Sequence, residues 1–260
     1  MATYNKRGYK AKKEKMKDTV NDPNLEENST TAEVFNTLDE TASKTEDFVA
    51  TNQKYIFIVI GVVAALVLGY LGYQKFVKIP AQAEAMNEMY HAQKQYNEAV
   101  NGTANDSLYN LVLKGSEGKY GMLDIIENYS GTEAANLANY YAGVSYLNLK
   151  DYKNAITHLD QYSGEDQMTG PMAKGAIGDA FVQLDQKEEA LKYYVKAAEM
   201  RDNELTAPTN YYKAGVIALE LGEASDALEY FNIIKDNYSD VNEASQVDAF
   251  IAKAKVMANK

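Results

Sequence analysis

The chain has 260 residues, a formal net charge of −11 and no cysteine, which excludes disulfide bonds and thiolate metal sites. Its two histidines, His91 and His158, belong to no pattern with metal-ligand spacing, and no glycine-rich phosphate loop occurs. The sequence therefore predicts a protein that is not an enzyme and that holds no cofactor and no metal ion. Both histidines are expected to be ordinary surface or interface residues.

Residues 1–54 are predicted to form a disordered tail whose charge is divided into a basic part and an acidic part. Seven basic residues up to Lys17 face only Glu14, whereas residues 18–54 carry nine acidic residues against Lys44 and Lys54. The basic part is a candidate for contact with anionic lipid headgroups or with ribosomal RNA, and a merely solvated tail is the alternative. Its members are Lys6, Arg7, Lys10, Lys12, Lys13, Lys15 and Lys17.

Residues 55–74 are predicted to form a single transmembrane helix. This run of twenty residues contains no charge, and eleven of them are Ile, Val, Leu or Phe. At a rise of about 1.5 Å per residue the run spans about 30 Å, the thickness of the hydrocarbon core of a bilayer. A helix buried in a soluble domain is seldom apolar on every face over this length. A cleaved signal peptide ending near Ala81-Gln82-Ala83 is the competing interpretation, but the apolar run and the preceding tail are too long for one.

Small residues form a ridge along this predicted helix. Gly61, Ala65 and Gly69 are each four residues apart, and Gly72 lies close to the same line. Such a ridge permits the close approach of a second membrane helix, although small residues also recur by chance in spans.

The orientation of the span follows less directly from the charges. Two lysines lie just before it and three, Lys75, Lys78 and Lys94, lie after it, so the nearest charges do not favour a cytoplasmic N-terminus. The distant basic cluster does favour one, and a long domain can be translocated largely regardless of its charge. We therefore expect the N-terminus to be cytoplasmic.

Residues 75–132 are predicted to contain juxtamembrane helices and one degenerate repeat. Residues 81–100 carry a helical apolar pattern through Ala85, Met89, Ala92, Tyr96 and Ala99. The segments 108–113 and 120–129 have the character of a degenerate repeat unit.

Three related segments follow, in which equivalent residues are 35 and 37 positions apart. Each has a glycine, an alanine twelve residues later, and a large side chain four residues after that. These are Gly143, Ala155 and Leu159; Gly178, Ala190 and Tyr194; and Gly215, Ala227 and Phe231. The small residues let two antiparallel helices approach closely, and the large residue fills the space beside them. Breaks at Lys150-Asp151, Asp185-Gln186 and Gly222 supply the turns between the helices.

This pattern resembles the tetratricopeptide repeat, a helix pair with a period of 34 residues. It departs from the family at the usual tryptophan position, where Asn139, Lys174 and Tyr211 stand. We predict an all-α protein: one transmembrane helix followed by an α-solenoid of three divergent repeats at 133–240 and a capping helix at 241–260.

Such arrays usually bind peptides or helices on the concave side, which the first helix of each pair lines. The expected groove is mostly apolar, as suits an amphipathic helix or an unfolded client segment, unless the terminal helix of the chain fills it. Its predicted residues are Leu137, Tyr140, Val144, Leu147, Met172, Asp179, Val182, Thr209, Tyr212, Val216 and Leu219. A carboxylate clamp of the kind found in chaperone-tail receptors is not expected, because only Lys213 matches it.

The order of basic tail, single span and repeats resembles the YfgM family of bacterial inner-membrane proteins, and the stretch before the span resembles relatives in Bacteroidota. The resemblance implies a cytoplasmic N-terminus, a periplasmic repeat region, and association with the SecYEG translocon and periplasmic chaperones. It therefore predicts a non-enzymatic adaptor for translocating proteins. The alternatives are a scaffold of envelope assembly or cell division, and a regulatory binding module that faces the cytoplasm.

Overall fold

The computed structural model describes residues 30–102 and 106–259, with side chains described from Phe48 onward. The described residues form helices connected by short turns, and they contain no β-strand. The helices are α1 (Thr30–Tyr73), the π-helical turn η1 (Gln74–Lys78), α2 (Ile79–Asn101), α3 (Asp106–Lys114), α4 (Met122–Asn128), α5 (Glu133–Asn148), α6 (Tyr152–Gln161), α7 (Thr169–Gln183), α8 (Lys187–Met200), α9 (Thr206–Leu221), α10 (Ala224–Asn237), the 3₁₀ turn η2 (Asn242–Ser245) and α11 (Val247–Ala258). The predicted all-α fold is confirmed.

The chain divides into two units, residues 1–69 and residues 70–260. Among the described residues, one helical run, Phe48–Asn101, is long and apolar enough to cross a membrane. No residue of its most apolar stretch is buried in the protein. Helix α1 already begins at Thr30. Residues 30–54, which the sequence analysis placed in a disordered tail, are therefore helical. The tail is polar, but it contains no proline after Pro23, so nothing in its backbone stops the helix from extending.

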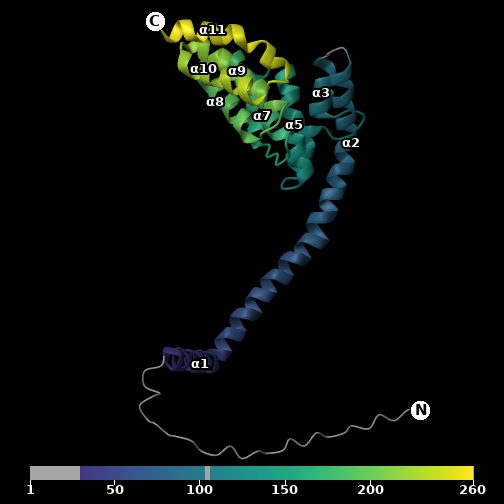
Figure 1. Ribbon diagram of the computed structural model, residues 1–260. Helices are drawn as coiled ribbons and strands as arrows, with labels where there is room; N and C mark the ends of the chain where they lie inside the picture. Colours follow the sequence, from purple (N-terminus) through teal and green to yellow (C-terminus); the bar gives the residue numbers. More distant parts are fainter. Residues whose placement is uncertain (1–29, 103–105, 260) are drawn as a thin grey trace, which may run out of the picture. The chain divides into compact units, whose positions relative to one another are not determined.

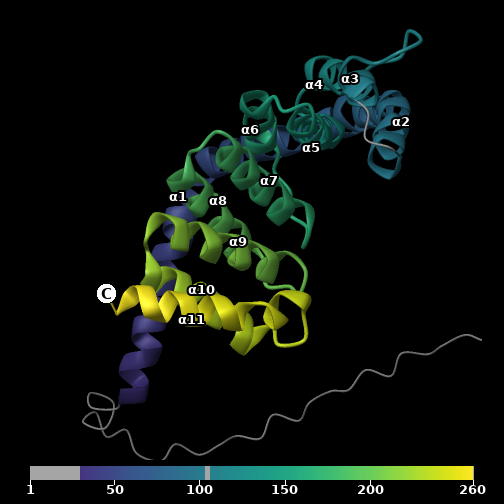
Figure 2. The same ribbon diagram turned by 90° about the horizontal axis from the view of Figure 1, so that it is seen from above.

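In the second unit, the predicted helix pairs are α5 with α6, α7 with α8, and α9 with α10. Figure 2 shows these pairs stacked in chain order, with α11 against the last pair. The predicted turns are also found where expected, because Lys150, Asp185 and Gly222 have positive φ angles of 61°, 55° and 83°. A residue in this left-handed conformation commonly ends a helix and lets the chain reverse.

The glycines of the repeats sit where the two helices of each pair meet. A Cβ atom added at Gly143 would lie 2.5 Å from the Leu159 side chain, and one at Gly178 would lie 2.6 Å from the Tyr194 ring. At Gly215 it would lie 2.6 Å from the Phe231 ring. The large residue of each repeat therefore occupies the space that the missing side chain leaves, as the spacing predicts.

The helices from α2 to α11 (Figure 1) share hydrophobic core clusters that follow one another along the chain. At one end α2, α3, α4 and α5 share a cluster around Met89, Val112 and Ile125, all fully buried. At the other end α11 closes the array, because Val247 and Ile251 pack with Phe231 of α10. In the range 241–260, where a capping helix was predicted, lie η2 and α11. The segment 108–113 falls within α3, and α4 covers residues 122–128 of the segment 120–129.

Candidate protein-binding groove

The first helices of the three repeats, α5, α7 and α9, line a groove of about 450 Å³. Six of the residues predicted from the repeat alignment line it: Tyr140, Val144, Leu147, Met172, Asp179 and Thr209. The structure adds residues that the groove prediction did not include: Tyr96, Gly175, Ala176, Leu205, Thr206, Asn210 and Lys213. The groove is therefore shared by all three repeats and by α2, which supplies Tyr96.

Five predicted groove residues lie elsewhere. Three of them, on α9, pack into the last core cluster with α11: Tyr212, Val216 and Leu219. The Tyr212 ring meets the Phe250 ring of α11 edge-on, with centroids 5.4 Å apart. The terminal helix of the chain thus covers this end of the repeat surface, and Tyr212 is not an open anchor. The other two, Leu137 and Val182, pack against the cores between neighbouring helices.

Apolar side chains form the accessible rim of the groove. Met172 on α7 is 45% exposed and Leu205, just before α9, is 59% exposed. Tyr140 lies deeper, at 9% exposure, and its ring packs against the Tyr162 ring with a centroid distance of 5.2 Å. Burial raises the pKa values of Tyr140 and Tyr96 above the ordinary value of 10.0, so both hydroxyls stay neutral donors at physiological pH. The groove therefore offers apolar contacts with a few hydroxyl groups.

A charged pair lies inside the groove and joins two repeats. Lys213 Nζ on α9 lies 2.7 Å from Asp179 Oδ1 and 2.9 Å from Asp179 Oδ2 on α7. The Tyr194 hydroxyl on α8 donates to the same Asp179 Oδ1 at 2.6 Å, and burial together with this carboxylate raises the pKa of Tyr194. Since Lys213 is already paired, it is not a free cation for a ligand carboxylate.

At the bottom of the groove, the Asn210 side chain of α9 packs against Gly175 of α7. Asn210 is 5% exposed and donates from Nδ2 to the Thr206 carbonyl oxygen at 2.7 Å. Its Oδ1 atom lies so close to Gly175 that an added Cβ there would be 2.5 Å away. Helices α7 and α9 can approach this closely beside Asn210 only because residue 175 has no side chain. Periodicity alone does not reveal this contact, because Gly175 stands outside the repeated glycine positions.

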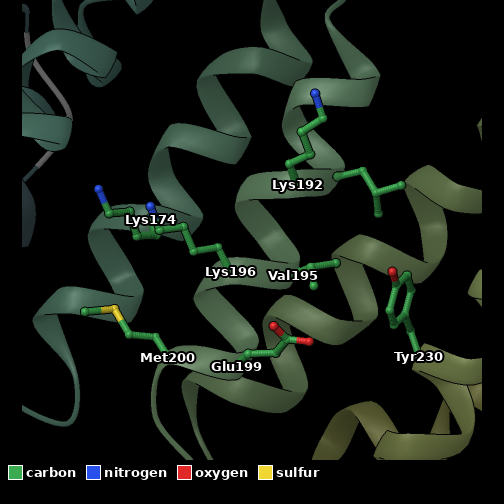
Figure 3. Close-up of a pocket in the computed structure, with 8 residues that line it drawn as sticks. Lys174, Lys192, Val195, Lys196, Glu199, Met200 and Tyr230 are labelled. Carbon is green, nitrogen blue, oxygen red and sulfur yellow. The ribbon is translucent and has the colours of Figure 1, made fainter.

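A second hollow, of about 640 Å³, lies over α8 and contains none of the predicted residues (Figure 3). Lys174 and Lys196 both approach the Tyr193 ring, with Nζ 5.9 and 5.8 Å from its centroid. Lys174 Nζ also lies 2.8 Å from Asp160 Oδ1, and this hydrogen bond lowers the pKa of Asp160. The cations of this hollow are thus partly neutralised by groups of the protein itself.

Both histidines take part in packing, as expected. His158 Nδ1 lies 2.9 Å from Asn139 Oδ1, its ring stacks on Tyr146, and burial lowers its pKa. His91 Nε2 lies 3.0 Å from the Ser116 hydroxyl. Within the described residues, no three His, Asp or Glu side chains are grouped so that they could hold a metal ion.

The small-residue ridge faces outward on the apolar helix. Gly61, Ala65 and Gly69 are exposed, and a Cβ atom added at Gly61, Gly69 or Gly72 would meet nothing within 4 Å. The predicted helix contact is therefore sterically open. The basic cluster from Lys6 to Lys17 lies outside the described residues.

Comparison with protein-family models matches three segments, 137–165, 173–204 and 209–240. These coincide with α5–α6, α7–α8 and α9–α10. The segments are tetratricopeptide repeats. No match to a curated protein was found. The matches identify the repeat and its general role in contacts between proteins.

Proposed function

We propose that this protein is a non-enzymatic, membrane-anchored adaptor that binds polypeptide segments in the groove of its tetratricopeptide repeats. The observation that carries the proposal is the groove lined by α5, α7 and α9, with the exposed Met172 and Leu205 at its rim. A concave surface with apolar contacts, a buried tyrosine and few free charges suits an amphipathic helix or an unfolded apolar segment.

The anchor in this proposal is the apolar run at 55–74, with a cytoplasmic N-terminus and the repeats in the periplasm of a bacterial inner membrane. The apolar stretch within Phe48–Asn101 is not buried in the protein, and this supports the membrane anchor. Exposed apolar surface of this size is stable only in lipid or against another protein. The resemblance to the YfgM family further suggests association with the SecYEG translocon, with periplasmic chaperones and with translocating clients. A ribosome or lipid contact of the basic tail belongs to the same proposal.

Site-specific crosslinking tests the groove and its partners together. A photoreactive amino acid at Met172 or Leu205 should crosslink to translocon subunits, chaperones or newly translocated chains in intact cells. The matched control is the same group at Glu188, an exposed residue on the second helix of the middle repeat. Equal crosslinking from Met172 and Glu188 would refute the groove, and products from division or wall machinery alone would refute the translocon assignment.

The orientation is tested independently of the partners. A topology reporter fused after Lys260 should be active only in its periplasmic form, and the repeats should be cleaved by protease added to spheroplasts. Protection of the repeats in spheroplasts, with cleavage after lysis, would place them in the cytoplasm and refute the periplasmic adaptor.

A further inference from the structure

A line of exposed apolar side chains runs along α2. Ile79, Met86 and Tyr90 are 59%, 44% and 68% exposed, and Ala83 between them is exposed as well. We call these four residues the α2 stripe. Helix α2 already buries another face, around Ala85, Met89 and Ala92, in the core that it shares with α3, α4 and α5. The α2 stripe is therefore a second apolar face on a helix whose first apolar face is already buried in the core.

The spacing of the α2 stripe is that of a coiled-coil seam. Its members are four, three and four residues apart, which corresponds to alternating d and a positions of a heptad. The two charged residues within this stretch, Glu84 and Glu88, occupy outer positions of that heptad rather than its seam. Apolar residues at a and d with charges kept outside favour packing against a second helix with the same pattern.

Lipid does not account for the exposure of the whole stripe. Met86 and Tyr90 lie 12 and 16 residues beyond Gln74, the last residue of the apolar run. At about 1.5 Å per residue these distances are roughly 18 and 24 Å along the helix. The headgroup layer adds only about 5–8 Å on each side of the hydrocarbon core. Lipid therefore does not cover the outer half of the stripe, which is free to contact a protein partner.

We propose that this partner is a second copy of the chain, and that two α2 stripes pair in a parallel dimer. The inference rests on the membrane anchor proposed above, because copies inserted in the same direction present identical residues at the same height. A two-fold dimer requires such a self-complementary surface. Confinement to one membrane raises the effective concentration of the two stripes, so a short seam suffices for association.

Disulfide scanning tests this dimer directly, because the natural chain has no cysteine. Full-length Met86→Cys and Tyr90→Cys variants in native membranes are oxidised with copper phenanthroline and run on non-reducing gels. The matched control is Glu84→Cys, which is exposed two residues before Met86 but lies off the stripe. We expect at least a five-fold larger dimer fraction at the stripe positions than at residue 84. Equal fractions at residues 84, 86 and 90 would overturn the proposal.

A second variant separates the dimer from the anchor. Met86→Glu combined with Tyr90→Glu, in an Ile79→Cys background, should abolish the Ile79→Cys crosslink while the thermal unfolding of the repeats stays unchanged, since both substituted residues are exposed. Carbonate extraction of the same membranes reports on the anchor. Release of the protein would overturn the anchor and the dimer together. Retention in the membrane with an undiminished crosslink would overturn only the assignment of the α2 stripe as the dimer seam.

Discussion

Substituting alanine for Gly215 tests the packing that builds the repeats. The new Cβ atom would lie 2.6 Å from both Cε1 and Cζ of Phe231, a ring with no exposed surface. Overpacking of this kind costs about 1–3 kcal/mol, and replacing a helical glycine by alanine returns about 0.5–1 kcal/mol. At the middle of these two ranges the net loss of stability is about 1 kcal/mol. For a folded unit of this size, that loss lowers the melting temperature by roughly 2–4 °C.

The assay is thermal unfolding of the full-length protein in detergent, followed by circular dichroism. Phe231→Leu provides the matched background, because a smaller side chain makes room for the new methyl group. If the steric reasoning is right, Gly215→Ala costs at least about 1 kcal/mol less in that background than in the natural one. An equal cost in both backgrounds, or a natural-background variant as stable as the original, would refute the close-packing account of the repeat glycines.

Three further predictions concern the turns, the pH dependence and the groove. Asp185 and Gly222 both have positive φ angles, which glycine adopts more readily than other residues. Asp185→Gly should therefore stabilise the protein by about 0.5–1 kcal/mol, and Gly222→Ala should destabilise it by about 1 kcal/mol. Urea unfolding of both variants measures whether each change in stability has the expected sign. Burial lowers the pKa of His158 below its ordinary value of 6.5, so the unfolded chain binds this proton more readily. Stability should therefore fall as pH drops through 6.5 toward the folded pKa, and His158→Gln should flatten that slope in unfolding curves. Lys213→Met should change stability by less than about 1 kcal/mol, since the ion pair of Lys213 with Asp179 is partly exposed. The variant should nevertheless alter which segments crosslink from the groove rim. A large drop in melting temperature would contradict the small expected change in stability.

The repeat architecture was predictable because it depends on residues that recur. Gly143, Gly178 and Gly215 fix where helices meet, and the large residue sixteen positions later must fill the space beside each of them. The turns were predictable for the same reason. Both features arise within a single repeat, so a local pattern contains all the information that they need.

The groove was only partly predictable, because its composition depends on contacts between distant segments. Alignment treats every outward position of α9 alike, yet Tyr212 packs against Phe250 of α11, whereas Thr209 lines the groove. Tyr96 joins the groove from α2, nearly fifty residues before the first repeat glycine, and no period in the sequence indicates this contact. The helical stretch at 30–54 was missed because its polar composition indicates solvation as much as it indicates a helix.

The helix that leads into the repeats has no loop between the apolar run and the first core. From Gln74 the chain continues through η1 and α2 to Ala85, the first fully buried residue of α2. Eleven residues at about 1.5 Å each separate Gln74 from Ala85 by about 16 Å along this helical stretch. Inserting four residues between them would lengthen the stretch by about 6 Å and turn the buried face of α2 by roughly 40° relative to Gln74. The number of residues in this stretch therefore determines the direction in which α2 presents its core-forming face.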